Sequence, residues 1–91
     1  MKYRKLPVVI EAFKFTGHQK NYEFIEEWSN SEVYIRGTNL SPEERELETY
    51  TLEGTMRGNV GDYVIKGVKG EYYFCKPDIF ELTYEAVNDD N

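Results

Sequence analysis

The sequence predicts a small α+β domain: a rolled, mainly antiparallel sheet of five or six strands with one short helix and one helical turn. First, 91 residues suffice for one core, so residues 1–91 are expected to form a single domain. Second, hydrophobic residues make up 40% of the chain and aromatic residues 15%, enough for a packed core without metal or disulfides. Third, short segments of alternating apolar residues recur between turns that contain glycine.

Charge and cysteine content exclude several functional classes. The formal net charge is −6 and no basic stripe is present, which argues against nucleic-acid binding. Cys75 is the only cysteine, so no internal disulfide can form, and one cysteine with one histidine cannot build a zinc site. The apolar run at residues 6–10 is too short for a signal peptide or a membrane span. We therefore expect a cytoplasmic protein without cofactor, metal or membrane contact.

The first strand is expected at residues 7–16. Apolar side chains on both of its faces predict a central strand that is covered on both sides. Glu11 interrupts this pattern, which leaves two interpretations. Either Glu11 lies at a sheet edge, or it is a partly buried carboxylate with a partner.

A helix, a strand and a loop should follow. Residues at about 20–29 have the spacing of a short amphipathic helix, with Phe24, Ile25 and Trp28 on its apolar face. Residues 32–36 alternate as a second strand. Residues 37–46 combine charge with Asn, Ser and Pro, which predicts a mobile loop.

The middle of the chain predicts a hairpin. Alternation resumes at residues 47–52, and Glu53-Gly54 fits a two-residue turn. A short strand is expected at residues 55–57, and residues 58–62 should form a second turn.

Residues 61–82 carry the clearest local signals. Gly61 can adopt a positive φ and Asp62 can cap neighbouring amides, which turns the chain sharply into the next strand. The expected elements are a strand at 63–65, a turn at 67–70, a strand at 71–75, a proline-initiated helical turn at about 77–82 and an added strand at 83–87. Residues 88–91 should fray.

No catalytic constellation emerges, so the chain is expected not to be an enzyme. A binding surface is suggested by aromatic and basic residues in and next to the last hairpin, which could hold an anionic ligand or stack a base. The candidate binding residues are Tyr63, Lys66, Tyr72, Tyr73 and Lys76. In the alternative interpretation these tyrosines pack over the core and expose only their hydroxyl groups.

Several segments resemble a known family. They are Met1 to Ala12 (MKYRKLPVVIEA), Gly61 to Glu71 (GDYVIKGVKGE), Cys75 to Glu81 (CKPDIFE) and Thr83-Tyr84-Glu85. Together they cover about half of the chain and resemble the small phage and prophage proteins named for a Pro-Gly-Asp-Tyr-Gly (PGDYG) motif. Val60 replaces the proline of that motif and Val64 its final glycine. The resemblance implies a phage or prophage origin and the cytoplasm of the bacterial host, and it transfers no catalytic residue.

The leading hypothesis is therefore a phage or prophage accessory protein that acts without catalysis, by binding a host or phage macromolecule, most plainly a protein. The alternative is a small-ligand or nucleotide-binding module that uses the tyrosine and lysine residues of the hairpin. A homodimer through an open sheet edge is a further expectation, because small sheets leave edges unpaired.

Overall fold

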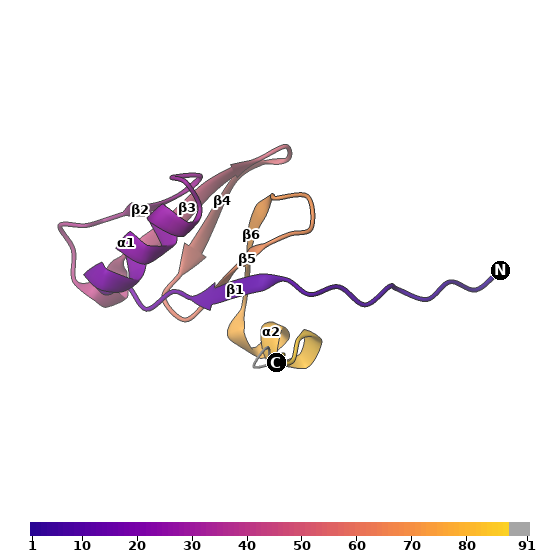
Figure 1. Cartoon of the computed structure of the whole chain (residues 1–91). Helices are drawn as coiled ribbons and strands as arrows, with labels where there is room; N and C mark the ends of the chain where they lie inside the picture. Colours follow the sequence, from indigo (N-terminus) through magenta and orange to yellow (C-terminus); the bar gives the residue numbers. More distant parts are fainter. Residues whose placement is uncertain (88–91) are drawn as a thin grey trace.

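The computed structural model describes residues 1–87, so the predicted frayed tail at 88–91 lies outside the described residues. Within residues 1–87 the chain forms two antiparallel three-stranded sheets and two α-helices (Figure 1). One sheet has the order β1-β5-β6 and contains β1 (Glu11–Lys14), β5 (Tyr63–Lys66) and β6 (Tyr72–Cys75). The other has the order β2-β3-β4 and contains β2 (Val33–Arg36), β3 (Glu46–Thr51) and β4 (Gly54–Asn59). The remaining elements are α1 (Gln19–Trp28), a short 3-10 helix η1 (Pro42–Glu44) and α2 (Pro77–Thr83).

The predicted α+β class is confirmed, with six antiparallel strands among the described residues. They form two sheets that do not close. The core lies where α1 meets both sheets, because its buried members come from β1–α1, β2, β3, β5 and β6. They are Phe15, Ile25, Val33, Leu47, Val64 and Tyr72.

The predicted central strand at residues 7–16 is wrong in length and position. β1 contains only Glu11–Lys14 and is an edge strand. Glu11 pairs in register with Lys66, the last residue of β5, after which the chain turns. Residues 1–10 therefore extend past the end of β5, with residues 5–10 beside the β5–β6 turn, and they have no strand to pair with in the described chain. We call this extended segment the arm.

Glu11 is exposed, so the edge interpretation is confirmed.

The predicted first helix is confirmed within one residue at each end. Asn21 ties its first turn to β1: its side-chain Nδ2 donates to the Lys14 carbonyl at 2.9 Å, and its Oδ1 accepts from the Thr16 amide at 2.8 Å. The chain leaves α1 through Asn30 and Ser31, both with positive φ. This tight reversal lets β2 return alongside the helix.

The predicted loop at residues 37–46 contains η1 and the first residue of β3. Arg45 binds this loop to the rest of the chain. Its Nη1 donates to the Gly17 carbonyl at 2.9 Å, its Nη2 donates to the Thr38 carbonyl at 3.1 Å, and its guanidinium lies 5.5 Å from the centre of the Tyr22 ring. The mobility of the loop stays a prediction.

The β3–β4 turn lies one residue earlier than predicted. Thr51 pairs with Gly54, so the two turn residues are Leu52 and Glu53. Thr51 favours this register because its hydroxyl donates to the Gly54 carbonyl at 2.8 Å and accepts from the Glu53 amide at 3.2 Å.

The second predicted turn is also shorter than expected, because Gly58 and Asn59 belong to β4. Gly58 is buried under the ring of Phe74, where a Cβ atom would lie only 3.0 Å from the nearest ring carbon. It is therefore a packing glycine that brings the two sheets together. The geometry predicted for the rest of the turn is confirmed: Gly61 has φ +98°, and Asp62 Oδ2 accepts from the Asn59 amide at 2.9 Å.

The C-terminal part differs from the prediction after residue 82. The expected helical turn is a seven-residue helix, α2, which includes Thr83. The strand predicted at 83–87 does not form. Phe80 and Tyr84 instead stack with their ring centres 5.0 Å apart, and the Tyr84 amide donates to the Phe80 carbonyl at 2.9 Å. These contacts hold residue 84 next to the helix, and it does not pair as a strand.

Candidate binding site

The predicted binding residues lie on both faces of the β1-β5-β6 sheet. Lys66 and Tyr72 form a cross-strand pair, and directly paired residues share a face. Tyr63 and Tyr73 occupy alternate positions of the same strands, so they point to the opposite face. Lys76 follows the end of β6. The structure therefore does not gather the five residues on one surface.

Tyr63 contacts α2, and Tyr73 contacts Tyr84, the residue directly after α2. The rings of Tyr63 and Phe80 stack with centres 3.9 Å apart and an interplanar angle of 8°. The hydroxyl oxygens of Tyr73 and Tyr84 lie 3.3 Å apart, within hydrogen-bonding distance. Partial burial, then the neighbouring Tyr84 hydroxyl, raises the pKa of Tyr73 to about 12. For these two residues the packing interpretation fits well.

Tyr72 and Lys76 are engaged elsewhere. Tyr72 is 6% exposed and meets the ring of Trp28 edge-on, with centres 5.4 Å apart. Lys76 lies 3.5 Å from Asp62 Oδ2, the same carboxylate oxygen that caps the turn before β5. Lys66 is half-buried on the core face. The five candidate residues therefore do not form one continuous aromatic and basic surface.

A different surface stands out beside this hairpin. A hollow of about 700 Å³ opens between the start of β2, the β3–β4 hairpin and the start of β6. Tyr72 and Tyr73 contribute to its wall, so two of the predicted residues do lie at this site. We call it the tyrosine hollow; the residues that give it its character are Glu32, Tyr34, Tyr50, Leu52, Glu53 and Glu71.

The tyrosine hollow exposes large side chains at the tip of the β3–β4 hairpin. Tyr50 is 69% exposed and Leu52 is fully exposed. The rings of Tyr34 and Tyr50 meet at an angle of 57° with centres 5.6 Å apart. Partial burial, then the neighbouring Tyr50 hydroxyl, raises the pKa of Tyr34 to about 12. A tyrosine hydroxyl can donate a hydrogen bond to a ligand.

The charge of the hollow has one sign. Its lining includes Glu32, Glu53 and Glu71, and no Lys, Arg or His among the described residues. Apolar and aromatic area surrounded by carboxylates is suited to a ligand that combines apolar groups with positive charge.

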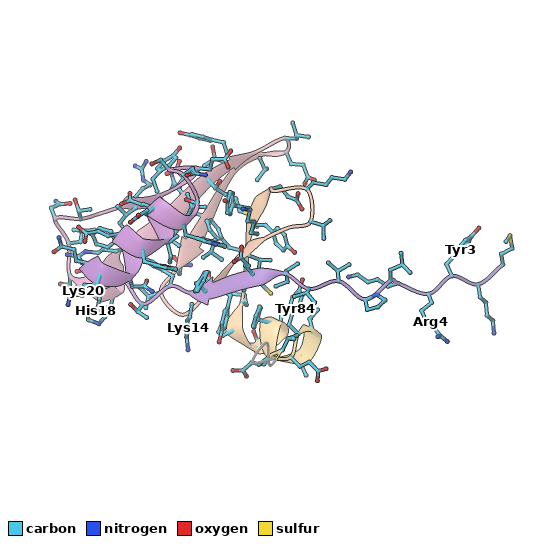
Figure 2. The ribbon with its side chains drawn as sticks, in the orientation of Figure 1. Tyr3, Arg4, Lys14, His18, Lys20 and Tyr84 are labelled. Carbon is cyan, nitrogen blue, oxygen red and sulfur yellow. The ribbon has the colours of Figure 1, made fainter. Side chains whose placement is uncertain are left out.

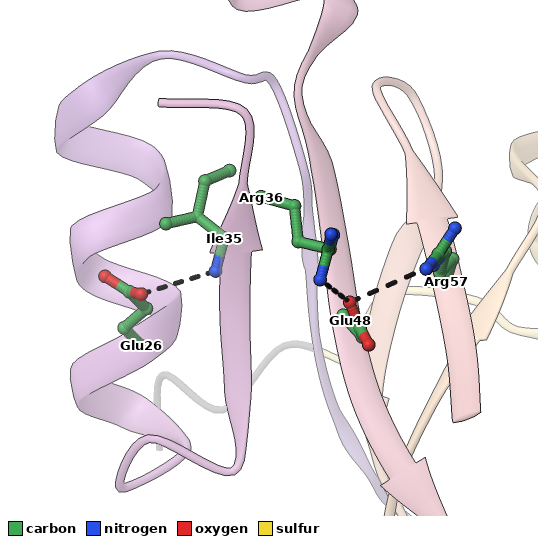
Figure 3. A network of polar contacts seen from close by, with 5 residues as sticks. All are labelled: Glu26, Ile35, Arg36, Glu48 and Arg57. Carbon is green, nitrogen blue, oxygen red and sulfur yellow. Dashed lines mark hydrogen bonds and ion pairs between the residues drawn. The ribbon is translucent and has the colours of Figure 1, made fainter. Parts of the chain in front are cut away.

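Polar contacts within the β2-β3-β4 sheet, and between this sheet and α1, have a structural role (Figure 3). Glu48 is buried in β3, where its Oε2 lies 3.0 Å from Arg36 Nη1 and 3.8 Å from Arg57 Nε. Glu26 of α1 accepts a hydrogen bond from the Ile35 amide at 3.3 Å. This contact occupies a backbone donor on the outer side of β2, an edge strand. Both carboxylates are thus used within the fold.

The surroundings of Cys75 do not favour a reactive thiol. Partial burial, then the nearby Asp62 and Asp78 carboxylates, raises the pKa of the Cys75 thiol, which disfavours the reactive thiolate. Within residues 1–87 no three potential ligands among His, Cys, Asp and Glu are grouped as a metal site requires. None of the helices in that range has the length and apolarity of a membrane span.

Tyr34, Leu52 and Glu53 were not predicted as site residues. One signal was available: Leu52 is an apolar residue beside a predicted turn, where polar residues are usual. The closeness of Leu52 to Tyr34 and Glu71 in the hollow depends on how the two sheets pack, and no local sequence pattern indicates it.

No protein-family model, curated protein or solved structure matches this chain. The resemblance to the PGDYG-motif family stays a prediction.

Proposed function

We propose that this chain is a non-enzymatic binding protein that holds a basic and apolar segment of a partner protein in the tyrosine hollow. The observation that carries the proposal is the pairing of exposed Tyr50 and Leu52 with a lining that contains three glutamates and, in the described chain, no cation. Burial of exposed tyrosine and leucine side chains against a partner contributes favourable binding free energy. The carboxylates favour a partner segment that carries positive charge.

The setting we propose is a phage or prophage accessory role in the cytoplasm of a bacterial host. The resemblance to the PGDYG-motif family supports this setting. Non-enzymatic action is supported by the engagement of the buried carboxylates of Glu48 and Asp62 in ion pairs and by the raised pKa of Cys75.

The alternative, a nucleotide-binding or small-ligand module on the tyrosine and lysine hairpin, has weaker support. The five candidate residues of the hairpin lie on two faces of the sheet, and Tyr63, Tyr72, Tyr73 and Lys76 already have intramolecular contacts. The hollow itself would repel phosphate groups through Glu32, Glu53 and Glu71. Thermal-shift screening with nucleotides tests this alternative, and a ligand-dependent rise of several degrees would favour it over a protein partner.

The experiment for the leading proposal compares two matched leucines. Leu52 lies in the hollow, whereas Leu82 is 89% exposed on α2 and does not line it. Leu52→Ser should weaken binding of a basic, apolar ten-residue peptide about tenfold, which corresponds to about 1.4 kcal/mol. Leu82→Ser should leave it unchanged. Fluorescence anisotropy with labelled peptides measures both dissociation constants.

The charge requirement has its own pair of variants. Glu53→Lys should abolish peptide binding, because it places a cation beside the cations of the peptide, whereas Glu81→Lys on α2 should have little effect. Peptides with the same apolar residues but Glu in place of Lys provide the ligand control. Equal affinity for basic and acidic peptides would contradict the proposal. A protein captured from host lysate counts as the partner only if Glu53→Lys loses it and Glu81→Lys retains it.

A further inference from the structure

The arm packs little against the rest of the described chain, although its residues 5–10 line a hollow of about 620 Å³ with the β5–β6 turn and residues 83–85. Its residues 1–9 are all exposed, including Leu6 at 78% and Val9 at 77%. It leaves the body beyond the β5–β6 hairpin as an extended segment (Figure 1), and the side chains of Tyr3 and Arg4 project from it away from the rest of the molecule (Figure 2). Apolar side chains exposed in this way favour contact with another surface.

Local chemistry keeps the arm extended. Pro7 has no amide hydrogen and disfavours helical backbone at Leu6. The β5 strand ends opposite Glu11, so the described chain offers the arm no strand partner. Ten extended residues span at most about 35 Å, enough to cross a small domain. The arm is thus an extended, unpaired segment that is long enough to bind across the surface of another molecule.

Its charge is opposite to that of the remaining chain. The arm contains Lys2, Arg4 and Lys5 and no acidic residue. The formal net charge of the whole chain is −6, so removing these three cations leaves −9 on residues 11–91. The arm therefore combines positive charge with the apolar side chains of residues 6–10, the two properties that the tyrosine hollow selects.

We propose that the arm of one copy binds in the tyrosine hollow of a second copy, which forms a reciprocal, arm-exchanged homodimer. This inference rests on the proposed function, in that the hollow accepts a basic and apolar segment, and it names the first occupant. Each copy carries one arm and one hollow, so a two-fold arrangement uses both and closes the assembly. A partner protein with a similar segment then competes with the arm, and dimerisation controls access to the hollow.

This dimer differs from one formed by edge pairing. An edge-paired dimer needs a free strand edge and does not depend on the charge of the arm. Arm exchange instead depends on opposite charges at two separate places, and a charge swap can test both places.

The experiment uses two full-length variants. In the first, Arg4→Glu and Lys5→Glu reverse the charge of the arm. In the second, Glu32→Lys and Glu53→Lys reverse the charge of the hollow. Analytical ultracentrifugation should show the wild type changing with concentration from the 10.7 kDa chain to twice that mass. Each variant alone should dissociate at least tenfold more readily, because arm and hollow then carry the same sign.

Mixing the two variants should restore the dimer, since each arm then meets a hollow of opposite charge. This restoration also shows that both variants are folded. The matched control reverses two cations of the body, Lys14→Glu and Lys20→Glu, and should dimerise like the wild type (Figure 2). Raising the salt concentration should weaken the wild-type dimer.

Two results would overturn the inference. The first is a wild type that stays monomeric at millimolar concentration. The second is a dimer that persists in both variants, which would indicate edge pairing. If either occurs while Glu53→Lys still abolishes binding of the basic peptide, arm exchange fails and the proposed function stands.

Discussion

The two α-helices of this chain are held in different ways. α1 has ten residues and places Ile25 fully inside the core, with Trp28 packed beside it. α2 has seven residues, none of them buried, and contacts the sheet mainly through Phe80. Neither helix has a side-chain hydrogen bond at its N-cap. Since short helices in water depend on tertiary packing, α1 should unfold only with the whole domain, and α2 should open locally.

The largest effect is expected at Ile25. Ile25→Ala should lower the free energy of unfolding by about 2–5 kcal/mol, because it leaves a cavity among Phe15, Val33 and the other core residues. Urea denaturation followed by circular dichroism measures the change. The control Leu82→Ala, on the exposed side of α2, should change stability by less than about 0.5 kcal/mol. A comparable loss in both variants would contradict the distinction between the helices.

A smaller and more local effect is expected at Phe80. Phe80→Ala removes the stack with Tyr63 and should cost about 1–2 kcal/mol. Amide hydrogen exchange should accelerate throughout α2 and stay slow in α1. Ile79→Ala, at a half-exposed position of the same helix, is the control for altered helix propensity. Equal acceleration in both helices would show that α2 belongs to the global unfolding unit.

The smallest effect at neutral pH is expected at Tyr73. Its pKa is raised from an ordinary value of 10.0 to about 12, so the folded state holds the hydroxyl proton more tightly than the unfolded state. At neutral pH the hydroxyl is protonated in both states, so its titration does not change the free energy of unfolding there. As the pH rises from about 10 to 12, the unfolded state loses the proton first, and the stability of the wild type should fall. Tyr73→Phe should remove that share of the alkaline loss. Thermal unfolding at successive pH values compares the two proteins, and parallel curves above pH 10 would contradict the prediction.

Much of the fold was predictable because its signals are local. The first helix and the turn at Gly61 and Asp62 follow from residue spacing and from the backbone freedom of glycine. The errors concern partners that are distant in the sequence. The length of β1 is limited by the end of β5 at Lys66, and α2 extends because Phe80 and Tyr84 stack near Tyr63.

The candidate site was predictable only in part. Tyr72 and Tyr73 were identified because they lie in a clear hairpin, but the faces to which they point separate Tyr73 from Lys66. The tyrosine hollow joins three segments that are far apart in the sequence, around residues 31–34, 49–53 and 70–73. Its existence depends on how the two sheets pack, as at the contact of Gly58 with Phe74.

The only tryptophan of the chain provides an optical readout of this architecture. Trp28 meets the ring of Phe13 at 4.9 Å in the core, and the ring of Tyr72 at 5.4 Å. Tyr72 also contributes to the wall of the hollow. Indole emission can therefore follow two processes without a label: a large shift when the core unfolds, and a smaller intensity change when a bound segment contacts the hollow wall at Tyr72.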